Sequence, residues 1–85
     1  MSNKERLAIE LAKHSGMKLS VEGTHLHATL YDVSSLVCKL TGNRADDYVV
    51  EAAALDAGWL WYDAELYGDM DALINLIYAA RGTGE

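Results

Sequence analysis

The N-terminal segment has the apolar spacing of an amphipathic helix. Apolar residues recur three and four positions apart, at Leu7, Ala8, Leu11 and Ala12. Ser2 and Glu5 are spaced as a capping box, in which the serine accepts from a backbone amide and the glutamate reaches back. Gly16 is a typical left-handed residue just beyond a helix end. We therefore predict a helix over about residues 3–15.

A strictly alternating segment follows this helix. Met17, Leu19 and Val21 alternate with Lys18, Ser20 and Glu22, and Leu26, Ala28 and Leu30 alternate with His25, His27 and Thr29. The intervening residues Glu22-Gly23-Thr24 are suited to a turn. The alternation predicts a β-hairpin with one apolar face directed at the core.

Two helices are predicted in the middle of the chain. Asp32 is the expected N-cap of the first, because apolar residues follow at helical spacing, and Gly42 is its expected end. Asn43 is the expected cap of the second, which should end at Gly58.

The segment Trp59–Tyr62 is apolar at every position, which is typical of a strand that is covered on both faces or central in a sheet. It could also be an exposed patch for a partner. Weak alternation continues to Gly68, so the strand could be long or fold back, and residues 63–68 also admit a helix.

The last predicted helix begins at an Asp69 cap and ends at Gly82, with Arg81 favourably placed near its C-terminus. Its apolar stripe consists of Met70, Leu73, Ile74, Ile77 and Tyr78. Residues 83–85 are expected to fray. The predicted order is α-β-β-α-α-β-α, an α+β fold in which a sheet of about three strands is covered by about four helices. We expect one domain over residues 1–85, without an internal repeat.

Composition places this chain of 85 residues in the globular class. It contains no apolar run of about 18 residues, and its N-terminus lacks the apolar core of a secretory signal. Cys38 is the only cysteine, so no internal disulfide can form. We therefore expect a cytoplasmic protein that does not interact with a membrane.

Charge is distributed unevenly along the chain. Residues 1–42 carry five cations and four anions, a balance of +1, whereas residues 43–85 carry two cations and nine anions, a balance of −7. Such an acidic half repels phosphate backbones, so we expect no direct nucleic-acid binding and predict a protein partner with a basic surface. Four of the nine acids have a local role, because they stand at predicted helix starts: Asp46, Asp47, Asp69 and Asp71.

Side chains that could carry chemistry are few. His25 and His27 share one strand face, which is a metal-site geometry, but no companion ligand stands at zinc-like spacing. Metal binding through this pair is therefore the weakest of the hypotheses. Cys38 has no recognisable neighbouring base, and no nucleophile elbow or glycine-rich phosphate loop is present. We expect neither an enzyme nor a cofactor.

The most informative cluster is aromatic and acidic. If residues 59–65 form one strand, Trp59 and Trp61 share a face with Asp63 and Glu65. We predict that this ridge, together with the remaining acids Glu51 and Asp56, is the partner-binding surface. Because the chain has no phenylalanine, the alternative is that its aromatic residues fill the core.

Two classes of function remain open. The first is a small acidic protein-interaction module, including an inhibitor that occludes a basic or nucleic-acid-binding surface of a larger complex. Phage anti-defence proteins that mimic DNA share this size and charge, which is an analogy only. The second is a self-associating structural or adaptor protein, in which the aromatic strand or the helical face Leu73–Tyr78 forms a homodimer interface.

Overall fold

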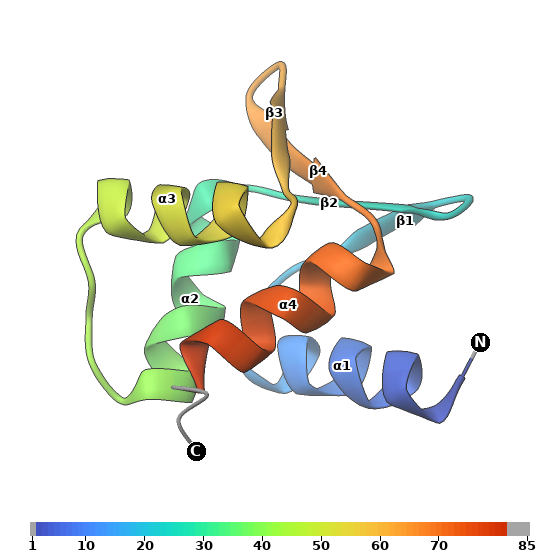
Figure 1. The fold of residues 1–85 in the computed structure, drawn as a ribbon, viewed down its shortest axis with the longest axis horizontal. Helices are drawn as coiled ribbons and strands as arrows, with labels where there is room; N and C mark the ends of the chain where they lie inside the picture. The colour runs from blue at the N-terminus through green and yellow to red at the C-terminus, as the bar shows by residue number, and fades with distance from the viewer. Residues whose placement is uncertain (1, 82–85) are drawn as a thin grey trace.

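The computed structural model describes residues 2–81 and contains helices and strands in the order shown in Figure 1. The elements are α1 (Asn3–His14), β1 (Ser20–Glu22), β2 (His25–Ala28), α2 (Leu30–Thr41), α3 (Asp47–Ala57), β3 (Leu60–Tyr62), β4 (Glu65–Gly68) and α4 (Met70–Ala80). The strands form one antiparallel sheet in the order β1-β2-β4-β3. The α+β class is confirmed, and the sheet has four strands rather than about three.

The helices cover one face of the sheet (Figure 1). Leu26 and Ala28 of β2 and Leu66 and Gly68 of β4 point to this face and are buried. Below them the core is completed by apolar helix residues, which include Leu36, Val50, Leu73 and Leu76. None of the helices within residues 2–81 is long and apolar enough to cross a membrane.

The aromatic segment is not a central strand, and it matches two of the alternatives, a strand that folds back and an exposed patch. The chain turns back at residues 63–64, so residues 60–68 form a second hairpin in which Leu60 is paired with Tyr67 and Tyr62 with Glu65. As a result β3 is an edge strand, and its three residues are exposed. The run of apolar residues is therefore not a strand that is covered on both faces. Trp59 is buried, and the three residues after it are exposed to solvent.

Most of the predicted helix boundaries are confirmed. Ser2 and Glu5 form the capping box, Gly42 and Gly58 are left-handed C-caps, and Asp69 accepts from the Ala72 amide. Gly82 and residues 83–85 lie outside the described part of the chain.

Two predicted N-caps are wrong. Thr29 rather than Asp32 caps α2, and Asp32 is its capping-box partner three residues later, with 2.8 Å between Thr29 Oγ1 and Asp32 Oδ2. Asp46 rather than Asn43 precedes α3, because the Asn43 amide bonds to the Thr41 hydroxyl in the linker instead.

The fold consists of two copies of one α-β-β-α unit. Residues 20–40 and 60–80 pass through the same strand-turn-strand-helix sequence, with nearly identical patterns of buried and exposed positions. Residues 6–17 match 48–59 in the same way, so the first copy has two extra residues between helix and hairpin. The equivalence extends to backbone detail: the Met17 amide bonds to the Ala12 carbonyl and the Trp59 amide to the Ala54 carbonyl, both at 3.0 Å.

The two copies are related by a pseudo-two-fold axis through the middle of the sheet. Strand β2 pairs with β4 through Leu26↔Gly68, His27↔Tyr67 and Ala28↔Leu66. Each residue has its counterpart 40 positions away in the other copy. Replacing both members of the pair Leu26↔Gly68 by their counterparts gives Leu66↔Ala28, which is the third pair, whereas His27↔Tyr67 is converted into itself. His27 and Tyr67 therefore meet at the axis.

The expectation of no internal repeat is wrong. The copies share only two identical residues between 20–40 and 60–80, Leu26/Leu66 and Leu36/Leu76. What they share is the burial required at each position, and many apolar side chains satisfy the same burial. Comparison of residue identities therefore misses the repeat that the fold displays.

Candidate functional site: the outer face of the sheet

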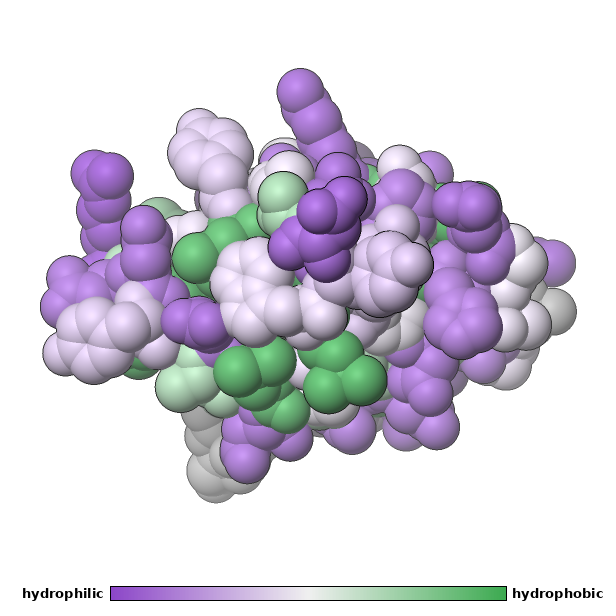
Figure 2. All heavy atoms as spheres, turned by 90° about the horizontal axis from the view of Figure 1, so that it is seen from above, coloured by the Kyte–Doolittle hydropathy of each residue, from purple (hydrophilic) through white to green (hydrophobic). Residues whose placement is uncertain are grey.

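No helix within residues 2–81 covers the outer face of the sheet (Figure 1). Because side chains alternate along each strand, one residue in two points to this face. The set comprises Ser20 and Glu22 of β1, His25 and His27 of β2, Glu65 and Tyr67 of β4, and Leu60 and Tyr62 of β3. Leu60 and Tyr62 are 67% and 68% exposed, which is unusual for large apolar side chains on a sheet. Ring-shaped side chains gather in the middle of the view from above in Figure 2.

Three rings meet at the centre of this face. His27 and Tyr67 stack with their centroids 4.8 Å apart and their planes inclined by 10°. Tyr62 meets Tyr67 edge-on, with centroids 5.2 Å apart. Aromatic pairs in these geometries stabilise one another by about 0.5–1.5 kcal/mol beyond their burial. The central rings therefore hold a fixed arrangement.

His27 is held between carboxylates from both hairpins. Its Nδ1 lies 2.8 Å from Oε1 of Glu65, a hydrogen bond, and its Nε2 lies 3.6 Å from Oε2 of Glu22. The carboxylate can only accept, so Nδ1 carries the proton. The contact joins β2 of the first copy to β4 of the second.

The face carries negative charge without cationic side chains to balance it. Residues 20–28 and 60–68 contain the carboxylates Glu22, Asp63 and Glu65 but no lysine or arginine. The Tyr67 hydroxyl responds to them: partial burial of its ring, and then the charges of Glu65 and Glu22, raise its pKa above the usual value. The negative potential therefore extends to the centre of the sheet.

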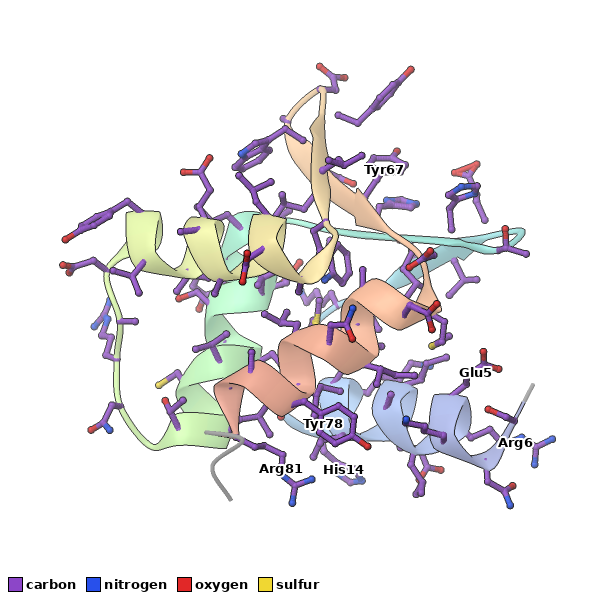
Figure 3. All side chains as sticks on the ribbon, viewed as in Figure 1. Glu5, Arg6, His14, Tyr67, Tyr78 and Arg81 are labelled. Atoms are coloured by element: carbon purple, nitrogen blue, oxygen red, sulfur yellow. The ribbon has the colours of Figure 1, made fainter. Side chains whose placement is uncertain are left out.

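A hollow of about 440 Å³ lies between the two hairpins on this face. Glu22 and His25 line it from the first hairpin, and Leu60, Trp61, Tyr62 and Tyr67 line it from the second. The hairpins project in different directions, and Tyr67 lies in the angle between them (Figure 3). We call this hollow the cradle.

The ridge predicted from Trp59, Trp61, Asp63 and Glu65 does not form, because the strand turns back after Tyr62. Trp59 is completely buried, and its indole Nε1 donates to the Ala72 carbonyl at 3.1 Å. Asp63 is at the hairpin turn, with φ of 61°, and only Glu65 reaches the outer face.

The other predicted binding residues are scattered around this face. Trp61 is 41% exposed, and its indole donates to the Glu51 carboxylate on α3. Asp56 is exposed near the end of α3 and is not one of the residues that line the cradle. Within residues 2–81 no group of three or more metal-ligating side chains is brought together, and His27 faces carboxylates of which only Glu65 is in hydrogen-bond range.

Tyr67, Tyr62, Leu60 and Glu22 were not among the predicted site residues. The signal for three of them is the alternation over residues 60–67, once the turn at 63–64 is recognised. Glu22 needs knowledge of strand order, since only the β2–β4 pairing brings the two hairpins together.

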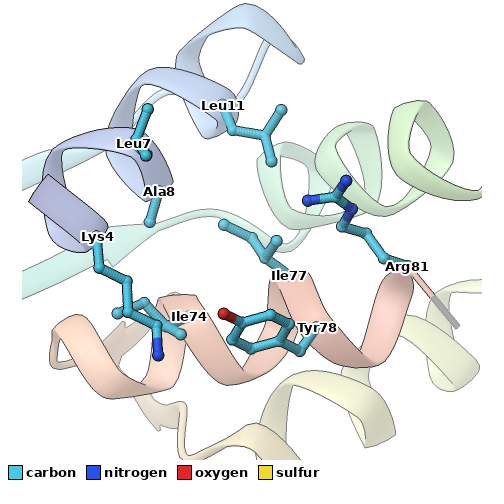
Figure 4. A pocket seen from close by; sticks show the side chains of 8 residues that line it. All are labelled: Lys4, Leu7, Ala8, Leu11, Ile74, Ile77, Tyr78 and Arg81. Atoms are coloured by element: carbon cyan, nitrogen blue, oxygen red, sulfur yellow. The ribbon is translucent and has the colours of Figure 1, made fainter. Parts of the chain in front are cut away.

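A second, smaller hollow of about 170 Å³ lies between α1 and α4 (Figure 4). Its floor is apolar, with Leu11, Ile74 and Ile77, and Lys4 and Arg81 stand at its rim. Lys4 Nζ lies 5.2 Å from the centroid of the Tyr78 ring. The charge of this hollow is thus opposite to that of the cradle.

Comparison with known proteins finds no matching family model, no matching curated protein and no matching solved structure.

Proposed function

We propose that this protein is a protein-interaction module that docks a basic partner surface on the outer face of its sheet. The observation that carries the proposal is the combination found there: exposed aromatic and apolar side chains, the carboxylates Glu22 and Glu65, and no lysine or arginine in either hairpin. Aromatic residues with a charged rim are typical of interface hot spots. Complementary charge accelerates docking and excludes anionic competitors such as nucleic acid.

The kind of partner follows from this charge. A surface rich in arginine and lysine, such as the nucleic-acid channel of a larger complex, complements the face, and a domain that occupies such a channel acts as an inhibitor. The proposal includes a cytoplasmic location and no catalytic step of its own.

A charge-reversal experiment tests the docking face. The probe is a short synthetic peptide of alternating arginine and glycine, with binding followed by calorimetry at low and high salt. Glu22→Lys with Glu65→Lys should weaken binding at least about tenfold, and salt should weaken binding to the unaltered protein because it screens the charges.

The matched control is Glu10→Lys with Asp56→Lys, which changes net charge equally at exposed helix positions. Circular dichroism confirms that both double variants are folded. Equal losses of affinity in the two variants would show that net charge, and not this face, is responsible. Absence of binding by the unaltered protein would reject the proposal.

Self-association is a second candidate, because β3 is an edge strand whose backbone has no neighbour on one side within residues 2–81. No lysine or proline protects this edge, and its three side chains are exposed. Two copies could therefore pair through β3 about a two-fold axis. Sedimentation should then show a dimer that Leu60→Lys dissociates; a monomer at all concentrations contradicts this candidate.

A further inference from the structure

The composition of the cradle specifies which basic side chain it accepts. Leu60, Tyr62 and Tyr67 supply apolar and aromatic walls, and Glu22 supplies a carboxylate at the opposite rim. An apolar ligand would leave that carboxylate without a partner, and an anion would be repelled by it. A cation with a flat, weakly hydrated surface satisfies both walls.

The pseudo-symmetry shows that the fold does not require these side chains. Counterparts in the two copies are similar where they face the core, as at Leu36/Leu76 and Val37/Ile77. On the outer face they differ in chemistry: Glu22 corresponds to Tyr62, and His25 to Glu65. The half of the face from the first copy is thus polar and titratable, and the half from the second copy is largely aromatic. The cradle combines these two kinds of side chain, and neither copy alone supplies both.

We infer that the cradle binds the guanidinium group of an arginine presented by the partner. The inference rests on the proposed docking function and names its central contact. Arginine fits better than lysine for two reasons. Its planar group stacks on aromatic rings, here the exposed Tyr62, and it donates two parallel hydrogen bonds to one carboxylate, here Glu22. Lysine presents a compact and strongly hydrated charge that gains less from either wall.

His27 limits where the guanidinium lies. The imidazole covers one face of the Tyr67 ring and occupies the Glu65 carboxylate through its Nδ1 proton. Glu22 keeps only a distant contact to His27, at 3.6 Å, and its side chain is 77% exposed. The arginine therefore pairs with Glu22 and Tyr62 and leaves the His27–Glu65 hydrogen bond in place.

The test uses three peptides that differ at one position, which is arginine, lysine or citrulline, the neutral counterpart of arginine. The flanking residues are glycine and serine, so that the varied position holds the only side chain that could enter the cradle as a guanidinium. Nuclear magnetic resonance follows the Trp61 indole and the tyrosine rings during titration. We expect the arginine peptide to bind about threefold to tenfold more tightly than the lysine peptide and at least about tenfold more tightly than the citrulline peptide.

Variants locate the contact. Tyr62→Leu should weaken the arginine peptide about threefold to tenfold, and Tyr62→Phe, which keeps the ring, should not. The matched control is Tyr48→Leu on α3, because Tyr48 is 70% exposed and Tyr62 is 68% exposed. Glu22→Gln should remove most of the preference for arginine over citrulline.

The outcomes separate this inference from the proposed function. If all three peptides bind equally, or Tyr62→Leu has no more effect than Tyr48→Leu, the arginine site is rejected. The docking face survives that result provided that Glu22→Lys with Glu65→Lys weakens binding of the basic peptide at least about tenfold, and more than the matched control does. If no basic peptide binds at all, both are rejected.

Discussion

The pKa of Tyr67 depends on the carboxylates of the outer face. It lies at the pseudo-two-fold axis, stacks on His27 and senses the carboxylates of both hairpins. These groups make its phenolate unfavourable in the folded protein. A single hydroxyl therefore reports on the charge of the whole outer face.

Alkaline titration should reveal this charge. The pKa of Tyr67 is raised above its ordinary value of 10.0 when the chain folds, so its contribution to stability is complete below that pH and is lost as pH rises through the folded pKa. Phenolate absorbance should contain a component above pH 10.0 that Tyr67→Phe lacks and that Glu65→Gln moves to lower pH. A titration unchanged in both variants would contradict this.

The two tryptophans should behave differently, although the sequence places them on one strand face. Trp61→Ala leaves only the buried Trp59, whose fluorescence should resist quenching by acrylamide. Trp59→Ala should cost about 3–5 kcal/mol of unfolding free energy because it empties a core site, whereas Trp61→Ala should cost less than about 1 kcal/mol. Denaturant unfolding measures both, and equal costs would show that the core is wrongly assigned.

At the level of helices and strands, the two copies fill equivalent buried positions with side chains of different size. The buried residue after the first helix is Met17 in one copy and Trp59 in the other, and the second strand ends at Ala28 or Gly68. A Cβ added at Gly68 would lie 3.0 Å and 3.1 Å from atoms of the Trp59 ring, and 2.9 Å from the Ala72 Cβ. Ala72 and the Trp59 ring therefore both restrict this position to glycine.

This pairing predicts coupling between the two positions. Gly68→Ala should cost about 1–3 kcal/mol through overpacking, and the cost should fall when Trp59→Met supplies the side chain of the first copy. A double-mutant cycle of unfolding free energies measures the difference. Additive losses of unfolding free energy would mean that the cost of Gly68→Ala comes from contact with Ala72 alone and not from contact with Trp59.

The residue at the turn of one hairpin can likewise be replaced by its counterpart in the other hairpin. Gly23 and Asp63 are counterparts with φ of 62° and 61°, a left-handed conformation that favours glycine. Asp63→Gly should therefore stabilise the protein by about 0.5–1 kcal/mol, and Gly23→Asp should destabilise it. Thermal unfolding compares the two, and a loss of stability in Asp63→Gly would show that its side chain contributes to the fold.

Local patterns were sufficient to predict most elements. Ser2, Gly42, Gly58 and Asp69 identified helix ends, because their capping interactions are with residues close in sequence. The turn at residues 63–64 was only one of three alternatives, beside a long strand and a helix, because an aspartate at positive φ gives a weaker signal than glycine. That one turn decided whether Trp59, Trp61, Asp63 and Glu65 would share a face.

At the scale of the whole molecule, the site depends on strand order, which no local pattern contains. The pairing of β2 with β4 places Glu22 and His25 near residues some 40 positions later in the chain. The acidic balance of the C-terminal half includes Asp63 and Glu65, but Glu22 and His25, two of the six residues that line the cradle, come from the first copy. The predicted partner, a basic protein surface, remains the proposal that this face supports.

The cradle and the hollow between α1 and α4 carry opposite charge, so the position at which a basic peptide binds can be determined. The most direct measurement is an amide and side-chain resonance map of the full chain titrated with the alternating arginine–glycine peptide. We expect the perturbed residues to cluster on the outer face of the sheet, at Glu22, His25, Leu60, Tyr62 and Tyr67. Perturbations confined to the hollow between α1 and α4, or spread evenly over the acidic helix positions, would contradict it.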